Sequence, residues 1–158
     1  MADLYGSDAF APAEIARRVE EVGVAKARLP LLQTAMLGVL AGAFIALGAL
    51  YFTLVASDAS LGFAATRIAG GVCFSLGLLL VVVAGAELFT GNNLLAMAWA
   101  AGRISAAEVL RNWAVVCAAN FAGLRRLKRF VSAMLLIWNS GSLPKSTWWL
   151  HELRCQYL

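Results

Sequence analysis

The residues of this chain that could take part in chemistry are concentrated in one short polar segment, ELFTGNN, at 87–93. The segment lies between an uncharged run, 68–86, and a second apolar stretch, 94–102. An ionisable residue such as Glu87 in apolar surroundings indicates a functional site by default, because its charge is costly to bury. We favour the structural alternative, in which Glu87 binds N–H groups of the segment or pairs with a basic residue of another helix.

Groupings that would support catalysis or metal binding do not occur in the sequence. The three cysteines, Cys73, Cys117 and Cys155, lie far apart, and the chain has a single histidine, His151. Without a CxxC motif they predict neither a disulfide framework nor a zinc site. The chain also has no paired carboxylates and no nucleophile with a neighbouring base. We therefore expect no enzyme activity, no cofactor and no metal.

The composition is typical of a membrane protein. Apolar residues make up 61% of the 158 residues and charged residues only 14%, whereas a soluble domain is about one quarter charged. Residues 29–57 carry no charge, and a helix needs about 20 apolar residues to cross the hydrocarbon core. This run predicts a spanning helix at about 31–55. Pro30 stands at its start, and Gly38 and Gly42 form a GxxxG spacing that permits close helix approach.

The second apolar region is too long for one straight spanning helix. Residues 68–86 would extend over roughly 28 Å as a helix, which matches the bilayer core, but residues 68–102 would extend over roughly 52 Å. We therefore predict a helix at about 67–86, an irregular loop at 87–93 and a half-helix at about 93–102.

The polar residues of the loop explain how the helix could break. Gly91 would relax the backbone, and Thr90, Asn92 or Asn93 would cap the half-helix that follows. The alternative is that the helix ends at Ala86 and that an amphipathic segment follows at the membrane interface.

The first segment, 1–28, is predicted to lie in the cytoplasm. Within it, residues 11–23 place Ile15, Val19 and Val22 on one helix face. Such an amphipathic helix lies at the membrane surface, packs on a neighbouring subunit or is simply solvated. Four basic residues precede the first span, one follows it and two follow the second apolar region: Arg17, Arg18, Lys26 and Arg28; Arg67; Arg103 and Arg111. This distribution predicts a multi-pass protein of a bacterial inner membrane with a cytoplasmic N-terminus.

A third helix is predicted to begin at Ser105, which can form a capping box with Glu108, and to run to about residue 123. Only the 13 residues 112–124 are uncharged before the basic cluster RRLKR at 125–129. Each cation near the bilayer centre costs about 2.5 to 3.5 kcal/mol on insertion scales. We therefore expect that this helix does not span the membrane.

The composition changes at residue 124. Residues 1–124 contain seven Lys/Arg and eight Asp/Glu, whereas residues 125–158 contain six Lys/Arg, one Glu and three of the five tryptophans. An altered reading frame after Gly123 or Leu124 would produce such a change, and translation of the downstream DNA in the other two frames tests this hypothesis. The alternative is a functional tail that binds anionic lipid headgroups or a protein partner. We expect no nucleic-acid binding by a membrane-bound chain.

Residues 70–93, GGVCFSLGLLLVVVAGAELFTGNN, resemble the second-helix signature of the formate/nitrite transporter family. Residues 14–48 and 100–123 resemble its surface helix with first span and the entry to its third helix, so the resemblance covers about residues 12–123. It implies an all-α polytopic membrane protein with an aquaporin-like broken-helix architecture. Family members have six helices in two inverted halves, form pentamers with one pore per subunit, and pass small monovalent anions such as formate, nitrite or hydrosulfide.

The resemblance also implies roles for residues of the second helix and the loop. Phe74 resembles the outer hydrophobic constriction, and Leu78 lies one turn further on the same face. Leu88, Phe89 and Thr90 resemble the inner constriction and the mobile loop beside it. Apolar gates would exclude hydrated ions, while the Thr90 hydroxyl and the positive end of the half-helix would attract an anion. The remaining residues of the broken-helix loop are Glu87, Gly91, Asn92 and Asn93.

Each of these residues also has a simpler interpretation. Phe74, Leu78 and Leu88 could serve only in helix packing. Thr90 could serve only as a helix cap.

The family's second half, which contributes a central histidine, finds no counterpart in this resemblance, and we do not give His151 that role. We expect a cytoplasmic segment at 1–28, a partial transporter domain at 29–123, truncated after the start of the third helix, and an unrelated tail at 124–158. The expected function is transport of small monovalent anions by a subunit that is incomplete and inactive as written. The alternative is a small membrane interaction protein whose basic, Trp-rich tail binds lipid or a partner.

Overall fold

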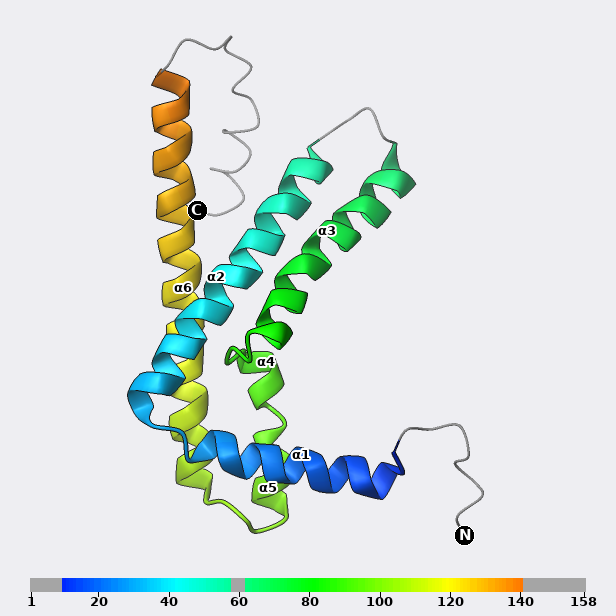
Figure 1. The fold of residues 1–158 in the computed structure, drawn as a ribbon, viewed down its shortest axis with the longest axis vertical. Coiled ribbons are helices and arrows are strands. Elements are labelled where there is room, and N and C mark those ends of the chain that lie inside the picture. Colours follow the sequence, from blue (N-terminus) through cyan, green and yellow to red (C-terminus); the bar gives the residue numbers. More distant parts are fainter. Residues whose placement is uncertain (1–9, 58–61, 141–158) are drawn as a thin grey trace.

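The computed structural model describes residues 10–57 and 62–140, with side chains as far as residue 133. Every regular element in these residues is a helix (Figure 1). The six helices are α1 (Pro12–Ala27), α2 (Leu31–Ala56), α3 (Phe63–Val83), α4 (Phe89–Asn92), α5 (Leu95–Ala100) and α6 (Ala106–Ser140). The aromatic and basic tail beyond residue 140, with His151 and Cys155, lies outside the described residues, as does the side chain of Trp138.

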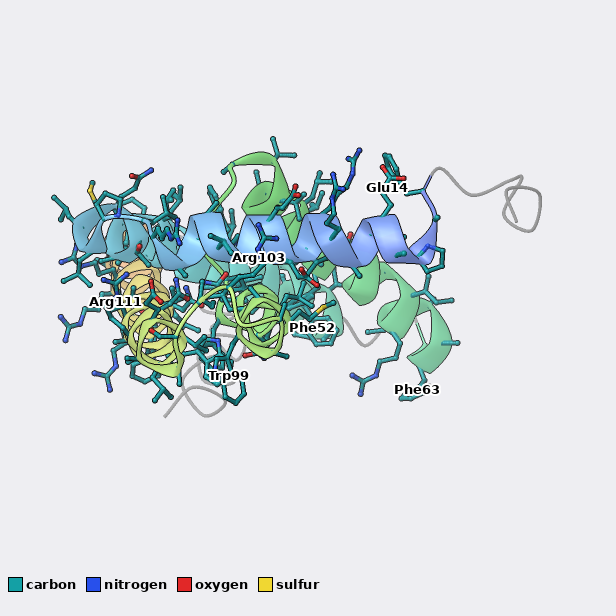
Figure 2. All side chains as sticks on the ribbon, turned by 90° about the horizontal axis from the view of Figure 1, so that it is seen from below. Glu14, Phe52, Phe63, Trp99, Arg103 and Arg111 are labelled. Carbon is teal, nitrogen blue, oxygen red and sulfur yellow. The ribbon has the colours of Figure 1, made fainter. Side chains whose placement is uncertain are left out.

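The helices form two groups that lie across each other. α2 packs against α3 on one side and against α6 on the other; α2 and α3 run side by side, and α6 diverges from them toward the end farther from α1 (Figure 1). α1 lies across the opposite end and packs on α5, as the view from below shows (Figure 2). α2 and α3 are long and apolar enough to cross a membrane, with mean hydropathies of 2.2 and 2.0. Most of their apolar surface is exposed, as expected for helices that face lipid or further protein.

Small residues allow α2 to approach both of its neighbours closely. A Cβ on Gly42 would overlap the backbone of Asn120 in α6, and a Cβ on Gly38 would lie 2.7 Å from that of Ala119. Toward α3, Gly48 faces Gly77. The prediction that the GxxxG spacing at 38 and 42 serves close helix packing is therefore confirmed.

The second spanning helix is shifted toward the N-terminus relative to the predicted 67–86. The helix begins at Phe63, four residues before Arg67, so the charge of Arg67 does not mark its N-terminus. The Arg67 guanidinium lies over the Phe63 ring, 5.2 Å from its centroid. The helix ends at Val83, because Gly85 adopts a φ of 61°. The Gly85 and Ala86 N–H groups donate to the carbonyl oxygens of Val82 and Val81, which is the Schellman pattern of a helix end.

The helix break therefore lies earlier than predicted. Residues 84–88 are not helical, whereas Phe89–Asn92 form the single turn α4. Gly91 lies within that turn and has no positive φ, so it is not the residue that breaks the helix. The predicted half-helix at 93–102 is the shorter α5, which ends in a second Schellman pattern at Gly102, with a φ of 70°.

The third long helix continues well past residue 123. α6 runs from Ala106 to Ser140, because no proline or left-handed glycine interrupts it and because Arg, Lys and Leu are good helix formers. The charges of the basic cluster oppose membrane insertion, not helix formation. The predicted capping box is confirmed: the Glu108 carboxylate accepts hydrogen bonds from the Ser105 N–H and hydroxyl at 2.8 Å, and the Glu108 N–H donates back at 3.3 Å.

Candidate functional site

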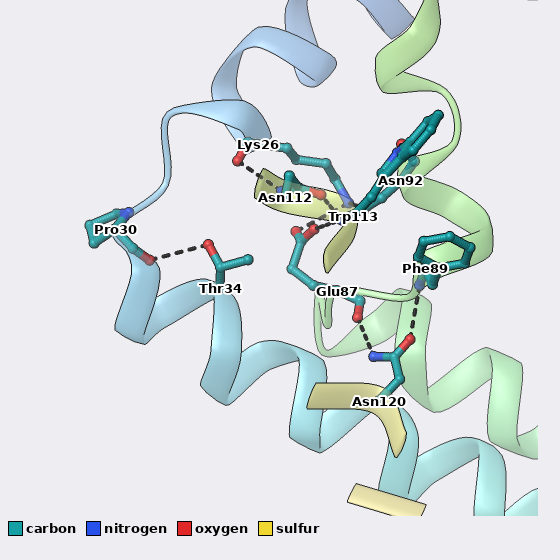
Figure 3. A network of polar contacts seen from close by, with 9 residues as sticks. All are labelled: Lys26, Pro30, Thr34, Glu87, Phe89, Asn92, Asn112, Trp113 and Asn120. Carbon is teal, nitrogen blue, oxygen red and sulfur yellow. Dashed lines mark hydrogen bonds and ion pairs between the residues drawn. The ribbon is translucent and has the colours of Figure 1, made fainter. Parts of the chain in front are cut away.

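The non-helical segment before α4 is held by a buried carboxylate. The Glu87 side chain is only 3% exposed, and one of its oxygens lies 3.1 Å from the Lys26 ammonium of α1 (Figure 3). Its other oxygen accepts a hydrogen bond of 2.7 Å from the Asn92 amide. The Glu87 N–H donates to the Leu37 carbonyl of α2. Pairing with a basic residue of another helix, the structural role favoured for Glu87, is therefore what the structure has.

Asn92 is the centre of the polar network. It is completely buried, and its amide nitrogen donates to the carboxylate of Glu87 and to Asn112 of α6, the latter at 2.9 Å. Its side-chain oxygen accepts from Lys26 at 3.1 Å, and its carbonyl accepts from the Trp113 indole N–H at 2.9 Å. Because both ends of the side-chain amide are occupied, Asn92 does not cap α5.

The other two predicted caps are not used either. The residue before α5 is Leu94, and no side chain caps that helix end. The N–H groups of Ala96 and Met97 donate to the carbonyl oxygens of Asn93 and Leu94. Two of the N–H groups in the first turn of α5 are thus already bonded within the turn, and the attraction of an anion by this helix start stays a prediction.

Three side chains of α6, none of them predicted as site residues from the sequence, complete the network. Asn112 and Trp113 bind Asn92, and Asn120 binds the backbone on both sides of Leu88 (Figure 3). Asn112 and Asn120 are eight residues apart, which places them on one face of a helix. Two amides on one face of an otherwise apolar stretch are a signal that could have identified them.

The first helix presents Lys26 to this network because its C-terminal half is docked. Gly23 and Ala27 are buried, and Ala27 packs in an apolar cluster with Leu95 and Ala98 of α5. The Arg111 guanidinium donates to the Ala27 carbonyl at 2.6 Å. Arg103 and Glu20 add an ion pair of 3.7 Å across the same contact, and Figure 2 shows Arg103 against α1.

A groove of about 320 Å³ lies beside the broken segment. Four of the predicted site residues line it, namely Leu78, Leu88, Thr90 and Gly91, and Lys26 contributes its cationic side chain. The remaining lining is apolar or glycine: Val81, Val82, Gly85 and Ala86. The structure therefore brings part of α3, the turn of α4 and the end of α1 together around one space.

The other predicted residues lie outside the groove lining. Phe74 is 40% exposed on α3, and Asn93 is exposed after α4. The Phe89 ring instead packs edge-on against Trp113, with centroids 6.3 Å apart. Glu87 and Asn92 lie behind the groove, where they bind the Lys26 ammonium.

The lining of the groove suits a small, weakly hydrated anion better than a cation. Apolar walls disfavour hydrated ions, while an ammonium group and a hydroxyl are donors for an oxygen of an anion. The Lys26 charge is partly compensated by Glu87, so it would attract an anion without holding it tightly. Such weak binding is what passage requires, since an ion must also leave.

The sequence is similar to known proteins over most of its length. Residues 13–154 match the model of the family described as formate/nitrite transporter. The chain is 37% identical to the formate channel FocA of Escherichia coli K12 over 150 residues, which cover 93% of this chain and 50% of FocA. It is 33% identical over 147 residues to a probable formate transporter of Methanothermobacter thermautotrophicus, covering 87% of this chain and 54% of that protein.

These comparisons also bear on the expected boundaries. The chain spans about half the length of the curated relatives that it matches. The family match continues to residue 154 and so extends past residue 123, where the resemblance was expected to end. The altered reading frame after residue 124 is a hypothesis from composition alone, and a match of this length does not support it. With its broken second helix and a match over most of its length, the chain belongs to the formate/nitrite transporter family, whose members are helical membrane transporters and channels.

Proposed function

We propose that this chain forms one wall of a membrane pathway for small monovalent anions of the formate and nitrite type. The observation that carries the proposal is the groove, in which Leu78, Leu88 and Thr90 lie together with Lys26. The names of the relatives, which are formate channels and formate transporters, support formate as the first substrate to test.

In this proposal each groove residue has a role that follows from the chemistry of its side chain. Leu78 and Leu88 narrow the path and exclude hydrated ions, since an apolar surface does not replace lost water. The Lys26 ammonium lowers the energy of a single negative charge beside them. The Thr90 hydroxyl donates a hydrogen bond to an anion oxygen. Phe74, which precedes Leu78 by one turn in α3, would form a separate constriction farther from the helix break.

The first test is protection of the groove by anions. We expect millimolar formate or nitrite to slow labelling of a T90C variant by a water-soluble thiol reagent, with the native cysteines replaced by serine. Sulfate, which is larger and divalent, should give no protection. Equal labelling rates with and without formate would contradict an anion site at Thr90.

The second test concerns the open side of the groove. Leu78 is 49% exposed and Thr90 is also exposed, so the groove can contact an anion on one side but needs a further protein wall before it forms a closed pathway. We therefore expect no selective formate or nitrite flux from this polypeptide alone in proteoliposomes. Clear flux would mean that copies of the chain complete the groove for one another.

We also propose that the chain lies in a bacterial cytoplasmic membrane with its N-terminus inside, and that the completed fold assembles as a homopentamer. The basic residues around α1 support this orientation, since such residues are retained on the cytoplasmic side. Native mass spectrometry in detergent would measure the assembly. A cysteine introduced before α1 should be labelled only from the cytoplasmic side of membrane vesicles, and labelling from the outside would reverse the orientation.

A further inference from the structure

Asn120 of α6 makes three hydrogen bonds that link two helices to the broken segment. Its amide nitrogen donates to the carbonyl oxygens of Gly38 in α2 and Glu87, each at 2.8 Å. Its side-chain oxygen accepts from the Phe89 N–H at 2.9 Å. The amide thus uses both of its donors and its acceptor, and Figure 3 shows it between Glu87 and Phe89.

The backbone groups that Asn120 binds are those that the helix break leaves without helical partners. Glu87 is in the non-helical segment, and Phe89 is the first residue of α4, whose N–H has no carbonyl one turn earlier in the same helix. In a membrane such groups must be satisfied by protein, because no water is present to bind them. Asn120 supplies one acceptor and one donor at this place.

The residue between these two bonds is Leu88, which lines the groove. Its backbone is extended, with φ −98° and ψ 131°, and both neighbouring peptide groups are held by the same side chain. The backbone of α6 is itself fixed against α2, since Gly42 leaves room only for the Asn120 backbone. Asn120 therefore ties Leu88 to α2 from the α6 side, in addition to the bond from the Glu87 N–H to the Leu37 carbonyl.

We propose that Asn120 is a positioning residue of the anion pathway, which holds Leu88 and Thr90 at the groove without touching the anion. This inference rests on the proposed function for its link to transport. The hydrogen bonds that Asn120 makes are independent of the proposed function.

The chemistry of an amide makes the inference testable. Aspartate has nearly the same shape but only accepts hydrogen bonds when ionised, so N120D places a carboxylate against the carbonyl oxygens of Gly38 and Glu87. When the carboxyl is protonated, one donor is restored. A residue that only fills space would not show this dependence on protonation.

The experiment uses the full chain in lipid nanodiscs, with T90C as the reporter and the native cysteines replaced by serine. Labelling rates are compared between the T90C parent and the same protein with N120D, N120L or the control substitution F121L. The Phe121 side chain is exposed on the same helix. Each rate is divided by that of F121L at the same pH, because thiol reactivity itself depends on pH.

We expect N120D to change the labelling rate of T90C on the order of tenfold at neutral pH, because the carbonyl groups of Gly38 and Glu87 lose their hydrogen-bond donor. The rate should return toward that of the parent as the pH falls and the carboxyl is protonated. N120L should be altered at every pH. Folded N120D and N120L proteins that label like the parent at every pH would overturn the inference.

A measurement on the unmodified chain covers the case in which a variant does not fold. In hydrogen exchange, the Phe89 amide should be protected to the same extent as amides within α3, and rapid exchange there would also overturn the inference. The two proposals can fail separately. Altered labelling in N120D without protection of T90C by formate would retain the positioning role and contradict the anion pathway.

Discussion

At the scale of single residues, the Glu87 carboxylate is a buried charge in the broken segment, and a buried charge needs partners. Both of its oxygens have partners, one in Lys26 and one in Asn92. That Glu87 needs a partner could be predicted from the sequence, because a charge among apolar residues must be compensated. The identity of the partner could not, because Lys26 reaches this network from α1, 66 residues away from Asn92.

Removal of the Lys26 charge should destabilise the fold. In K26M the Glu87 carboxylate stays buried without its cation, which typically costs about 3 to 5 kcal/mol, and the value here should be at the lower end because Lys26 is partly exposed. E87Q should cost less, since its amide still binds Asn92. A double-mutant cycle by thermal unfolding in detergent measures the coupling.

The control for this prediction is R17M on the same helix. The Arg17 side chain is 78% exposed and, among the residues that the structure describes, pairs with Glu21 one turn away, so its loss should not change the melting temperature measurably. If K26M melted like R17M, the pair would not contribute to holding the segment.

The capping box at Glu108 should make the stability of the protein depend slightly on pH. Hydrogen bonds from the Ser105 N–H and hydroxyl lower the pKa of Glu108 below its ordinary value of 4.5. Since the folded pKa is lower than the unfolded one, the capping box stabilises the protein above about pH 4.5 and loses this contribution as the pH falls through the folded pKa. E108A should reduce the fall in melting temperature below pH 4.5, and an unchanged pH profile would contradict the box.

At the scale of elements, the two helix breaks depend on glycines with positive φ. The apolar lengths predicted that the second helix must break, and this was correct because a bilayer has a fixed thickness. The position was wrong because Gly85 and Gly91 look equivalent in the sequence. Only the carbonyl and N–H positions around Gly85 distinguish the residue that ends α3 from one that continues a turn.

Substitution of these glycines by alanine separates the two roles. G85A must place a Cβ at a φ of 61°, which should cost roughly 1 to 2 kcal/mol. G91A has open space around its Cβ and a right-handed turn, so it should be neutral or slightly stabilising. Chemical denaturation of both variants measures the difference, and an equal loss of stability in both would contradict the assignment of the break to Gly85.

At the scale of the whole molecule, α6 combines a well-packed first half with a charged continuation. Gly123 packs against Val39, which lies roughly 12 Å along α2 from its start, so the basic cluster 125–129 follows at the level of the apolar middle of α2. Among the helices of the described residues, α2 and α3 are long and apolar enough to cross a membrane, and α6 is not. The contact pattern of α6 thus favours membrane depth, and its charges oppose it.

We expect the charges to prevail for α6 in isolation. In a microsomal insertion assay with glycosylation acceptor sites on either side, α6 should remain largely uninserted. Replacement of Arg125, Arg126, Lys128 and Arg129 by leucine should convert it to an inserted helix, since each cation costs about 2.5 to 3.5 kcal/mol at the centre. Replacement of the three arginines by lysine is the matched control and should change nothing. Efficient insertion of the unmodified helix would contradict this expectation.

The central claim is that this chain supplies one wall of an anion pathway, and a chimera tests it most directly. Residues 12–123 would replace the corresponding half of the Escherichia coli formate channel FocA, to which the chain is 37% identical. The chimera is then reconstituted in proteoliposomes and formate flux is measured. We predict formate flux that falls when Lys26 of the grafted half is replaced and that loses its selectivity over sulfate when Leu88 is replaced by alanine. A folded, assembled chimera that passes no formate would contradict the account.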